Sequence, residues 1–88
     1  MACRLLDPAR SDRSLEIERN GSLAWVRLSA FDAQDARDIQ RYRFWRKSLS
    51  LNGERLGRIR RVEEFAATPQ STYLGHFANP GLYLEFRP

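Results

Sequence analysis

The dipeptide Asn20-Gly21 is the strongest constraint on the fold, because it separates two runs in which apolar and polar residues alternate. Asn-Gly is the preferred two-residue loop of a β-hairpin, since both positions of a type I′ turn need a positive φ angle. With this turn, Arg19 lies opposite Ser22 and Ile17 lies opposite Ala24. One face of the predicted hairpin is then apolar throughout and consists of Leu15, Ile17, Ala24, Val26, Leu28 and Ala30. This face is predicted to pack against the core.

The other face of the hairpin has mixed chemistry and consists of Glu16, Glu18, Leu23, Trp25 and Arg27. A mixed face is typical of antiparallel strands that are exposed to solvent or only partly covered. We therefore expect the ring of Trp25 to be available for contact with a ligand. An exposed face with Leu23 and Trp25 also indicates a weak homodimer as the alternative to a monomer.

Asp32 predicts the start of a helix, because its side chain can cap the first turn and Asp35 adds a negative charge there. Acidic residues come early in this segment and basic residues late, which is the order that the helix dipole favours. The predicted core-facing stripe consists of Ala36, Ile39, Tyr42, Trp45 and Leu49. We favour a helix through Leu49. In the alternative, the helix ends near Tyr42, and residues 43–51 form a strand joined through Asn52-Gly53 to residues 55–65.

Residues 55–65 are predicted as a strand with Gly57 as the place of a bulge, although the apolar residues recur at every third position, as in a helix. Residues 71–88 predict a second hairpin with Asn79, Pro80 and Gly81 in its turn. In its predicted register, Tyr73 faces Phe86 on an apolar side.

These elements predict one small α+β domain over residues 14–88, with an antiparallel sheet of four to five strands and one helix packed on one face. The predicted order is β-β-α-β-β-β. Residues 1–13 lack periodicity and are predicted to form a flexible N-terminal arm. The order differs from that of an RRM or a double-stranded-RNA domain, and the GXXG loop of a KH domain is absent.

The positive charge of the chain is concentrated in one segment. Residues 41–61 contain eight basic residues and one acidic residue, a net charge of +7, whereas the rest contains seven basic and ten acidic residues, a net charge of −3. Fourteen of the fifteen basic residues are arginines. Arginine binds phosphate or carboxylate through two nitrogens and stacks on rings. The segment thus predicts a surface for an acidic partner, although a solvated helix face would have a similar composition.

Little in the sequence indicates catalysis. His76 is the only histidine and is predicted on an outer strand face, and Cys3 lies in the predicted arm. No cofactor or metal site is expected, because the chain lacks a phosphate loop and a set of converging ligand residues. Leu5-Leu6 is too short for a signal-peptide core, and no run is long enough to span a bilayer, so we expect a cytoplasmic protein without a membrane partner. A small basic nuclease remains the enzymatic alternative.

The function expected from the sequence is non-enzymatic binding of the nucleic-acid backbone or of a ribonucleoprotein. The predicted binding residues are Arg41, Arg43, Phe44, Arg46, Lys47, Arg55, Arg58, Arg60, Arg61 and Trp25. The alternative is an inhibitor or accessory protein that docks on an acidic protein or nucleoprotein surface, with Trp25, Phe44 and Tyr83 as anchors. Small proteins of phages and mobile elements, anti-CRISPR proteins among them, provide the analogy for this alternative.

Overall fold

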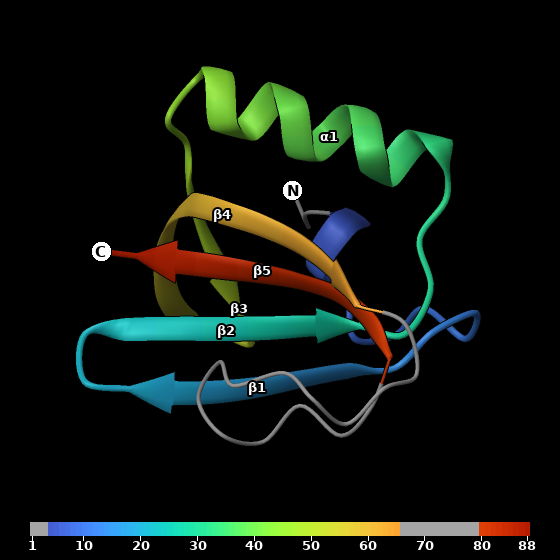
Figure 1. The fold of residues 1–88 in the computed structure, drawn as a ribbon, viewed down its shortest axis with the longest axis horizontal. Coiled ribbons are helices and arrows are strands. Elements are labelled where there is room, and N and C mark those ends of the chain that lie inside the picture. The colour runs from blue at the N-terminus through green and yellow to red at the C-terminus, as the bar shows by residue number, and fades with distance from the viewer. Residues whose placement is uncertain (1–3, 66–79) are drawn as a thin grey trace.

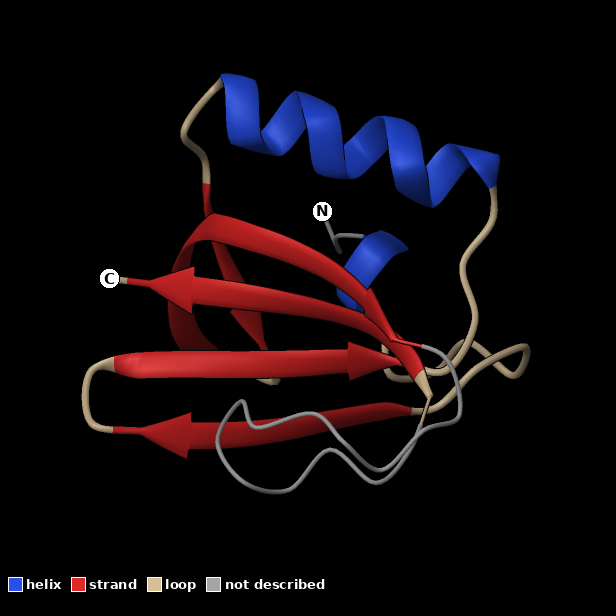
Figure 2. Ribbon diagram, viewed as in Figure 1, coloured by secondary structure: helices blue, strands red, loops and turns tan. Residues whose placement is uncertain are grey.

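One antiparallel sheet and one α-helix form the fold in the computed structural model, which describes residues 4–65 and 80–88. The five strands have the order β1-β2-β5-β4-β3, and the helix α1 lies over one face of the sheet (Figures 1 and 2). The elements are η1 (Arg4–Leu6), β1 (Leu15–Asn20), β2 (Leu23–Leu28), α1 (Ala33–Phe44), β3 (Ser48–Leu51), β4 (Glu54–Phe65) and β5 (Gly81–Arg87). The predicted α+β class and the order β-β-α-β-β-β are confirmed, although the third strand of the described order is β3 and not residues 55–65.

The first hairpin forms with a register that differs from the predicted one by two residues. Asn20 pairs with Leu23, so the turn consists of Gly21 and Ser22 rather than Asn20-Gly21. Gly21 has a φ of +62°, and glycine at the first central position is the pattern of a type II′ turn. Because side chains alternate with a period of two, a shift of two residues leaves each of them on its predicted face.

Helix α1 begins where the sequence predicts. The Asp32 carboxylate accepts a hydrogen bond of 2.8 Å from the backbone N–H of Asp35, and the Asp35 carboxylate accepts one of 3.2 Å from the backbone N–H of Asp32. This reciprocal pair is a capping box, which satisfies two backbone donors that would otherwise lack partners.

The helix ends at Phe44, so the prediction of a helix through Leu49 is wrong and the alternative is closer to the structure. The backbone N–H of Lys47 donates to the carbonyl of Tyr42 at 3.0 Å, and that of Arg46 donates to the carbonyl of Arg43 at 3.2 Å. These two bonds form a Schellman motif, in which Arg46 takes the left-handed position that glycine usually occupies, with a φ of +50°. The chain then turns back into β3.

The strands β3 and β4 form a hairpin around Asn52-Gly53. Both residues have a positive φ, +52° and +79°, as a type I′ turn requires. A register shift in β4 lies beside Gly57, at the predicted bulge, and a second one lies between Ile59 and Arg61. Each bulge adds one residue, so apolar side chains three positions apart can share one face of a strand. The spacing of three between Leu56, Ile59 and Val62 therefore comes from bulges and not from a helix.

The strand β5 pairs with both β2 and β4, which places it at the centre of the sheet. The expected apolar face of this strand is buried, with Leu82, Leu84 and Phe86 in the core. The other strand expected for the second hairpin, within residues 71–79, lies outside the described residues.

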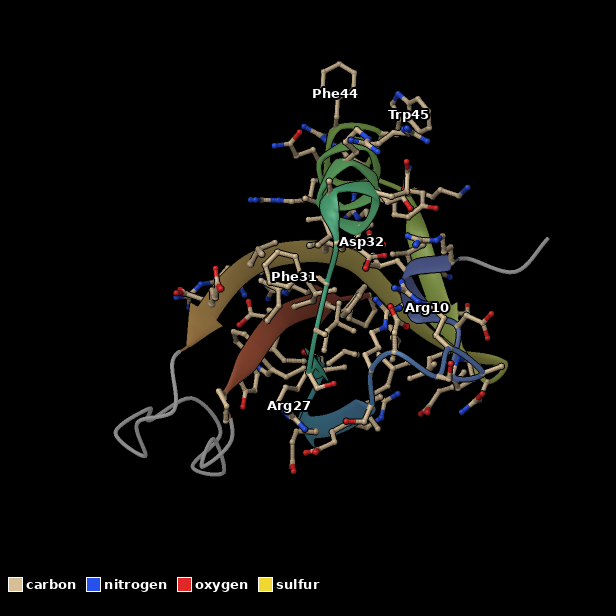
Figure 3. The ribbon with its side chains drawn as sticks, turned by 90° about the vertical axis from the view of Figure 1, so that its right-hand side faces the viewer. Arg10, Arg27, Phe31, Asp32, Phe44 and Trp45 are labelled. Atoms are coloured by element: carbon tan, nitrogen blue, oxygen red, sulfur yellow. The ribbon has the colours of Figure 1, made fainter. Side chains whose placement is uncertain are left out.

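The core lies between the sheet, helix α1 and the N-terminal segment. It consists of Leu5, Leu6, Ala24, Val26, Leu28, Ile39, Leu49, Leu51, Leu56, Ile59, Leu82, Leu84 and Phe86. The prediction of a flexible arm over residues 1–13 is corrected for residues 4–13, because Leu5 is fully buried and Leu6 is 3% exposed. Figure 3 shows this N-terminal segment packed under one side of α1.

Three arginines fix this segment to the start of α1. Arg4, Arg10 and Arg13 each reach the carboxylate of Asp35, with the closest distance, 2.7 Å, from Arg10. The Asp35 side chain is fully buried, so these partners compensate a charge that would be costly alone. A hydrogen bond from Arg4 also lowers the pKa of Asp32. These arginines are therefore structural.

Within the described parts of the chain, no helix has both the length and the apolar character needed to cross a membrane.

Candidate functional site

Arginines from three elements line an open hollow of about 310 Å³ where the end of α1 lies next to the sheet. We call it the basic hollow. Its lining residues are Arg43, Arg46, Arg58, Ile59, Arg60 and Arg87. The segments that supply them all lie at the end of the molecule that contains the C-terminus (Figure 1).

Local structure brings these residues together. The Schellman motif places Arg46 directly after the end of α1, and Arg43 lies in its last turn. On the sheet side, Arg58 of β4 pairs with Arg87 of β5. Gly57 permits this close pairing, because a Cβ atom there would lie only 2.3 Å from the carbonyl oxygen of Arg87.

The charges in the basic hollow are poorly compensated. Among residues 4–65 and 80–88, no carboxylate lies within ion-pair distance of its four most isolated arginines, which are Arg43, Arg46, Arg58 and Arg87. The fifth, Arg60, has its Nε 3.5 Å from Oε1 of the buried Glu85, without a hydrogen bond between them. Like charges directly opposite in neighbouring strands, as at Arg58 and Arg87, destabilise a sheet.

Most other arginines have acidic partners. In the described part of the chain, the arginines with a carboxylate at ion-pair distance outside the basic hollow are Arg4, Arg10, Arg13, Arg19, Arg27, Arg41 and Arg61. The fold therefore neutralises arginine in many places and leaves a group of them open in one place. An anion in the hollow would reduce the repulsion among them.

Of the ten predicted binding residues, Arg43, Arg46, Arg58 and Arg60 line the basic hollow together. The other predicted cations do not line it. Arg41 lies 3.7 Å from Asp38, Arg61 lies 2.6 Å from Glu63, and Arg55 donates to the hydroxyl of Ser48 at 3.3 Å. Lys47 lies over the ring of Tyr42, at 5.3 Å from its centroid.

The predicted role of Trp25 is corrected by the structure. Trp25 is 2% exposed, so its ring cannot receive a base or a protein side chain at the surface. Tyr83 and Glu85 on β5 are buried as well, at 1% and 4% exposure, so this sheet face is covered rather than solvated.

Aromatic residues at the end of α1 are instead exposed. Phe44 was expected at the surface and is 83% exposed, whereas Trp45, expected in the core, is 60% exposed because the helix ends before it. In Figure 3 both side chains project from the side of α1 that faces away from the sheet. The guanidinium carbon of Arg41 lies 5.8 Å from the centroid of the Trp45 ring.

Arg87 is the binding candidate that sequence reasoning missed. It lies near the C-terminus, outside the basic segment, and reaches the hollow only through the pairing of β5 with β4. The predicted hairpin paired residues 82–86 with an earlier strand of residues 71–79, so it gave no signal that Arg87 approaches Arg58.

A larger open groove of about 510 Å³ lies on the other side of Arg43, between α1 and the sheet. Its lining is mainly apolar and includes Phe31, Ile39, Val62 and Leu82, and it also contains the acidic Glu64 and the basic Arg43. Opposite charges on its lining give it no clear preference for an anion. The smaller, basic hollow is therefore the cavity whose lining favours an anion.

Among the residues that the structure describes, side chains suited to catalysis do not gather at either cavity. Within the described ranges, no three His, Cys, Asp or Glu side chains are placed to hold a metal ion. His76 and Cys3 both lie outside the described residues.

Comparisons with known proteins give no relative: no protein-family model matches the chain, and neither curated proteins nor solved structures contain a significant match.

Proposed function

We propose that this protein is a non-enzymatic nucleic-acid-binding protein that holds the phosphate backbone in the basic hollow. The observation that supports this best is the set of four arginines there without a carboxylate partner among the described residues, from the end of α1, β4 and β5. Arginine presents planar donor pairs that match two phosphate oxygens, so a small group of them favours phosphate over a diffuse negative surface.

The proposed contacts are to the backbone and not to base edges. Guanidinium groups in the hollow would position a phosphate, and phosphate contacts alone carry no sequence information. We therefore expect affinity that depends strongly on salt concentration and little on base sequence.

The protein-docking alternative has less support. It relies on Trp25, Phe44 and Tyr83 as anchors, and two of these, Trp25 and Tyr83, are buried in the fold. Binding hot spots need side chains that a partner can reach, so only Phe44 of the three fits that role. A polyanion uses the observed features more completely.

The test is fluorescence anisotropy of labelled oligonucleotides titrated with the protein at several salt concentrations. The test variant is Arg46→Gln with Arg58→Gln, and the matched control is Arg37→Gln with Arg55→Gln. Both pairs remove two exposed arginines that make no ion pair within the described residues, so the change in net charge is the same. Only the first pair lines the basic hollow.

We expect the hollow variant to weaken binding to single strands and to reduce the log–log salt slope by about 1.4, which is about 0.7 for each lost phosphate contact. The control is expected to change both quantities much less. Equal losses in the two variants would show that only general charge matters and would contradict the proposal. Binding that is absent at physiological salt would also contradict it. Gel electrophoresis of the same oligonucleotides after incubation tests the non-enzymatic part, since shortened products would indicate a nuclease.

A further inference from the structure

We propose that the nucleic acid is single-stranded, and that Phe44 and Trp45 receive its unpaired bases while the basic hollow holds its phosphates. This inference rests on the proposed function. It adds the class of nucleic acid and assigns a role to two rings that the fold leaves at the surface.

Phe44 and Trp45 both lie at the surface. Among the described residues, Phe44 and Trp45 are the most exposed of the large hydrophobic side chains, at 83% and 60%. Single exposed apolar residues are common on protein surfaces, but here two consecutive aromatic residues are both more than half exposed. Neither ring contributes to the core, so the fold itself does not explain them.

Both rings are next in sequence to arginines of the basic hollow. Phe44 directly follows Arg43, and Trp45 directly precedes Arg46, and both of these arginines line the basic hollow. The rings project away from the sheet (Figure 3). The hollow is lined by residues from the end of the helix and from β4 and β5. Two rings thus lie between two cations within four residues of the chain. Sites for single strands combine cations that contact the backbone with rings that stack on bases.

Arg41 makes a contact with the ring of Trp45. An aromatic ring has two faces, and the guanidinium of Arg41 lies 5.8 Å from the centroid of this ring, within the range of a cation–π contact. That contact uses one face of the ring, and Trp45 is still 60% exposed. A base on the second face would complete a stack of guanidinium, indole and base.

A duplex cannot use these rings in the same way, because its bases are already stacked and paired. To stack on Phe44 or Trp45, a base of a duplex would first have to leave the helix, which costs free energy. The rings therefore favour a strand that is already unpaired. RNA and DNA share this chemistry, and separate oligonucleotides distinguish them.

The experiment compares single-stranded RNA, single-stranded DNA and duplex DNA of the same length in anisotropy titrations. The variants are Phe44→Ala and Trp45→Ala, with Phe31→Ala as the aromatic control, because Phe31 is 40% exposed but lines the other groove. We expect the wild type to bind at least one single strand about tenfold more tightly than the duplex. Each ring variant should lose between about fivefold and a hundredfold in affinity for that strand. Duplex binding and the Phe31→Ala variant should change less than about twofold.

Tryptophan fluorescence gives a second readout without relying on affinity. Trp25 is 2% exposed and Trp45 is 60% exposed, so a strand that stacks on the protein should quench Trp45 and leave Trp25 bright. In Trp45→Phe, the ring for stacking stays but the reporter is lost, so quenching should disappear while most of the affinity remains.

The outcomes separate the two proposals. If duplex binds as tightly as either single strand and the ring variants bind normally, while the Arg46→Gln and Arg58→Gln pair binds weakly, the single-strand inference is wrong and the proposed function stands. If none of the three nucleic acids binds, both are wrong, and the rings and arginines belong to a protein interface.

Discussion

Replacing Arg46 with glycine is expected to stabilise the fold and to weaken binding at the same time. Arg46 occupies the left-handed position of the Schellman motif, with a φ of +50°. A residue with a Cβ atom loses roughly 1–2 kcal/mol in this conformation, whereas glycine adopts it freely. Glycine also makes the unfolded chain more flexible, which costs about 0.4–1 kcal/mol. The middle values of these two ranges, about 1.5 and about 0.7 kcal/mol, leave a net gain of about 0.5–1 kcal/mol in the free energy of unfolding.

The gain is large enough to measure. In a domain of this size, 1 kcal/mol shifts Tm by about 4–8 °C, so Arg46→Gly should raise Tm by about 2–8 °C. The same variant removes one cation from the basic hollow, so the salt slope for a single strand should fall by about 0.7. Arg46→Ala is the matched variant, because it removes the same charge but keeps the strain. It should weaken binding equally without the gain in Tm.

The expected gain in stability comes from the backbone strain at Arg46. Strained residues persist where their surroundings or their function require them, and they occur often at binding sites. If Arg46→Gly binds as tightly as the wild type, the arginine at this position has no role in binding. If it melts at the same temperature as Arg46→Ala or below it, the strain argument is wrong. Asn52→Gly serves as a control for positive φ without a charge change, and it should gain little because asparagine tolerates this conformation.

Three further predictions concern the fold that holds the hollow in place. Gly57→Ala should lower the free energy of unfolding by more than about 2 kcal/mol in urea titrations, because its Cβ would meet the backbone of Arg87, whereas Gly53→Ala, with free space around it, should lose about 1 kcal/mol. Asp35→Ala should cost about 3–5 kcal/mol in the same assay, because it leaves the buried Arg13 without its carboxylate, and a loss below 1 kcal/mol would mean that the network is not structural. The Arg4 hydrogen bond lowers the pKa of Asp32 below its ordinary value of 3.8, so its contribution to stability is complete above about pH 4 and is lost as the pH falls through the folded-state pKa. In a Tm profile between about pH 2 and 6, Asp32→Asn, which keeps a good cap, should have a shallower acid-side fall than the wild type.

Local patterns predicted the parts of the fold that depend on near neighbours. The two faces of the first hairpin and the capped start of α1 follow from residues that are close in sequence. The end of the helix did not follow, because the Schellman motif has arginine where its usual signal is glycine. Without that signal, the spacing of Trp45 and Leu49 was compatible with the apolar stripe of a longer helix.

Long-range pairing explains the remaining errors. Whether Trp25 is buried depends on contacts to the outer face of the first hairpin, and no feature of the hairpin itself specifies them. Arginines of the N-terminal segment bind Asp35, which lies more than twenty residues later in the sequence. No local periodicity therefore indicated that this segment packs against the fold. For the same reason the basic segment identified four arginines of the hollow but not Arg87, which reaches it from the last strand.

The two groups of arginines in this chain show why clustering in sequence is a poor guide to function without the positions of the carboxylates. Arg10 and Arg13 converge on a fully buried Asp35, and their chemistry is used within the fold. At the other site, Arg58 and Arg87 lie opposite each other in neighbouring strands, and no carboxylate of the described residues lies within ion-pair distance of either one. A fold that neutralises arginines elsewhere but leaves these open retains a local cost in stability. A bound phosphate would offset that cost, which is why the open group, and not the larger number of arginines, carries the proposed function.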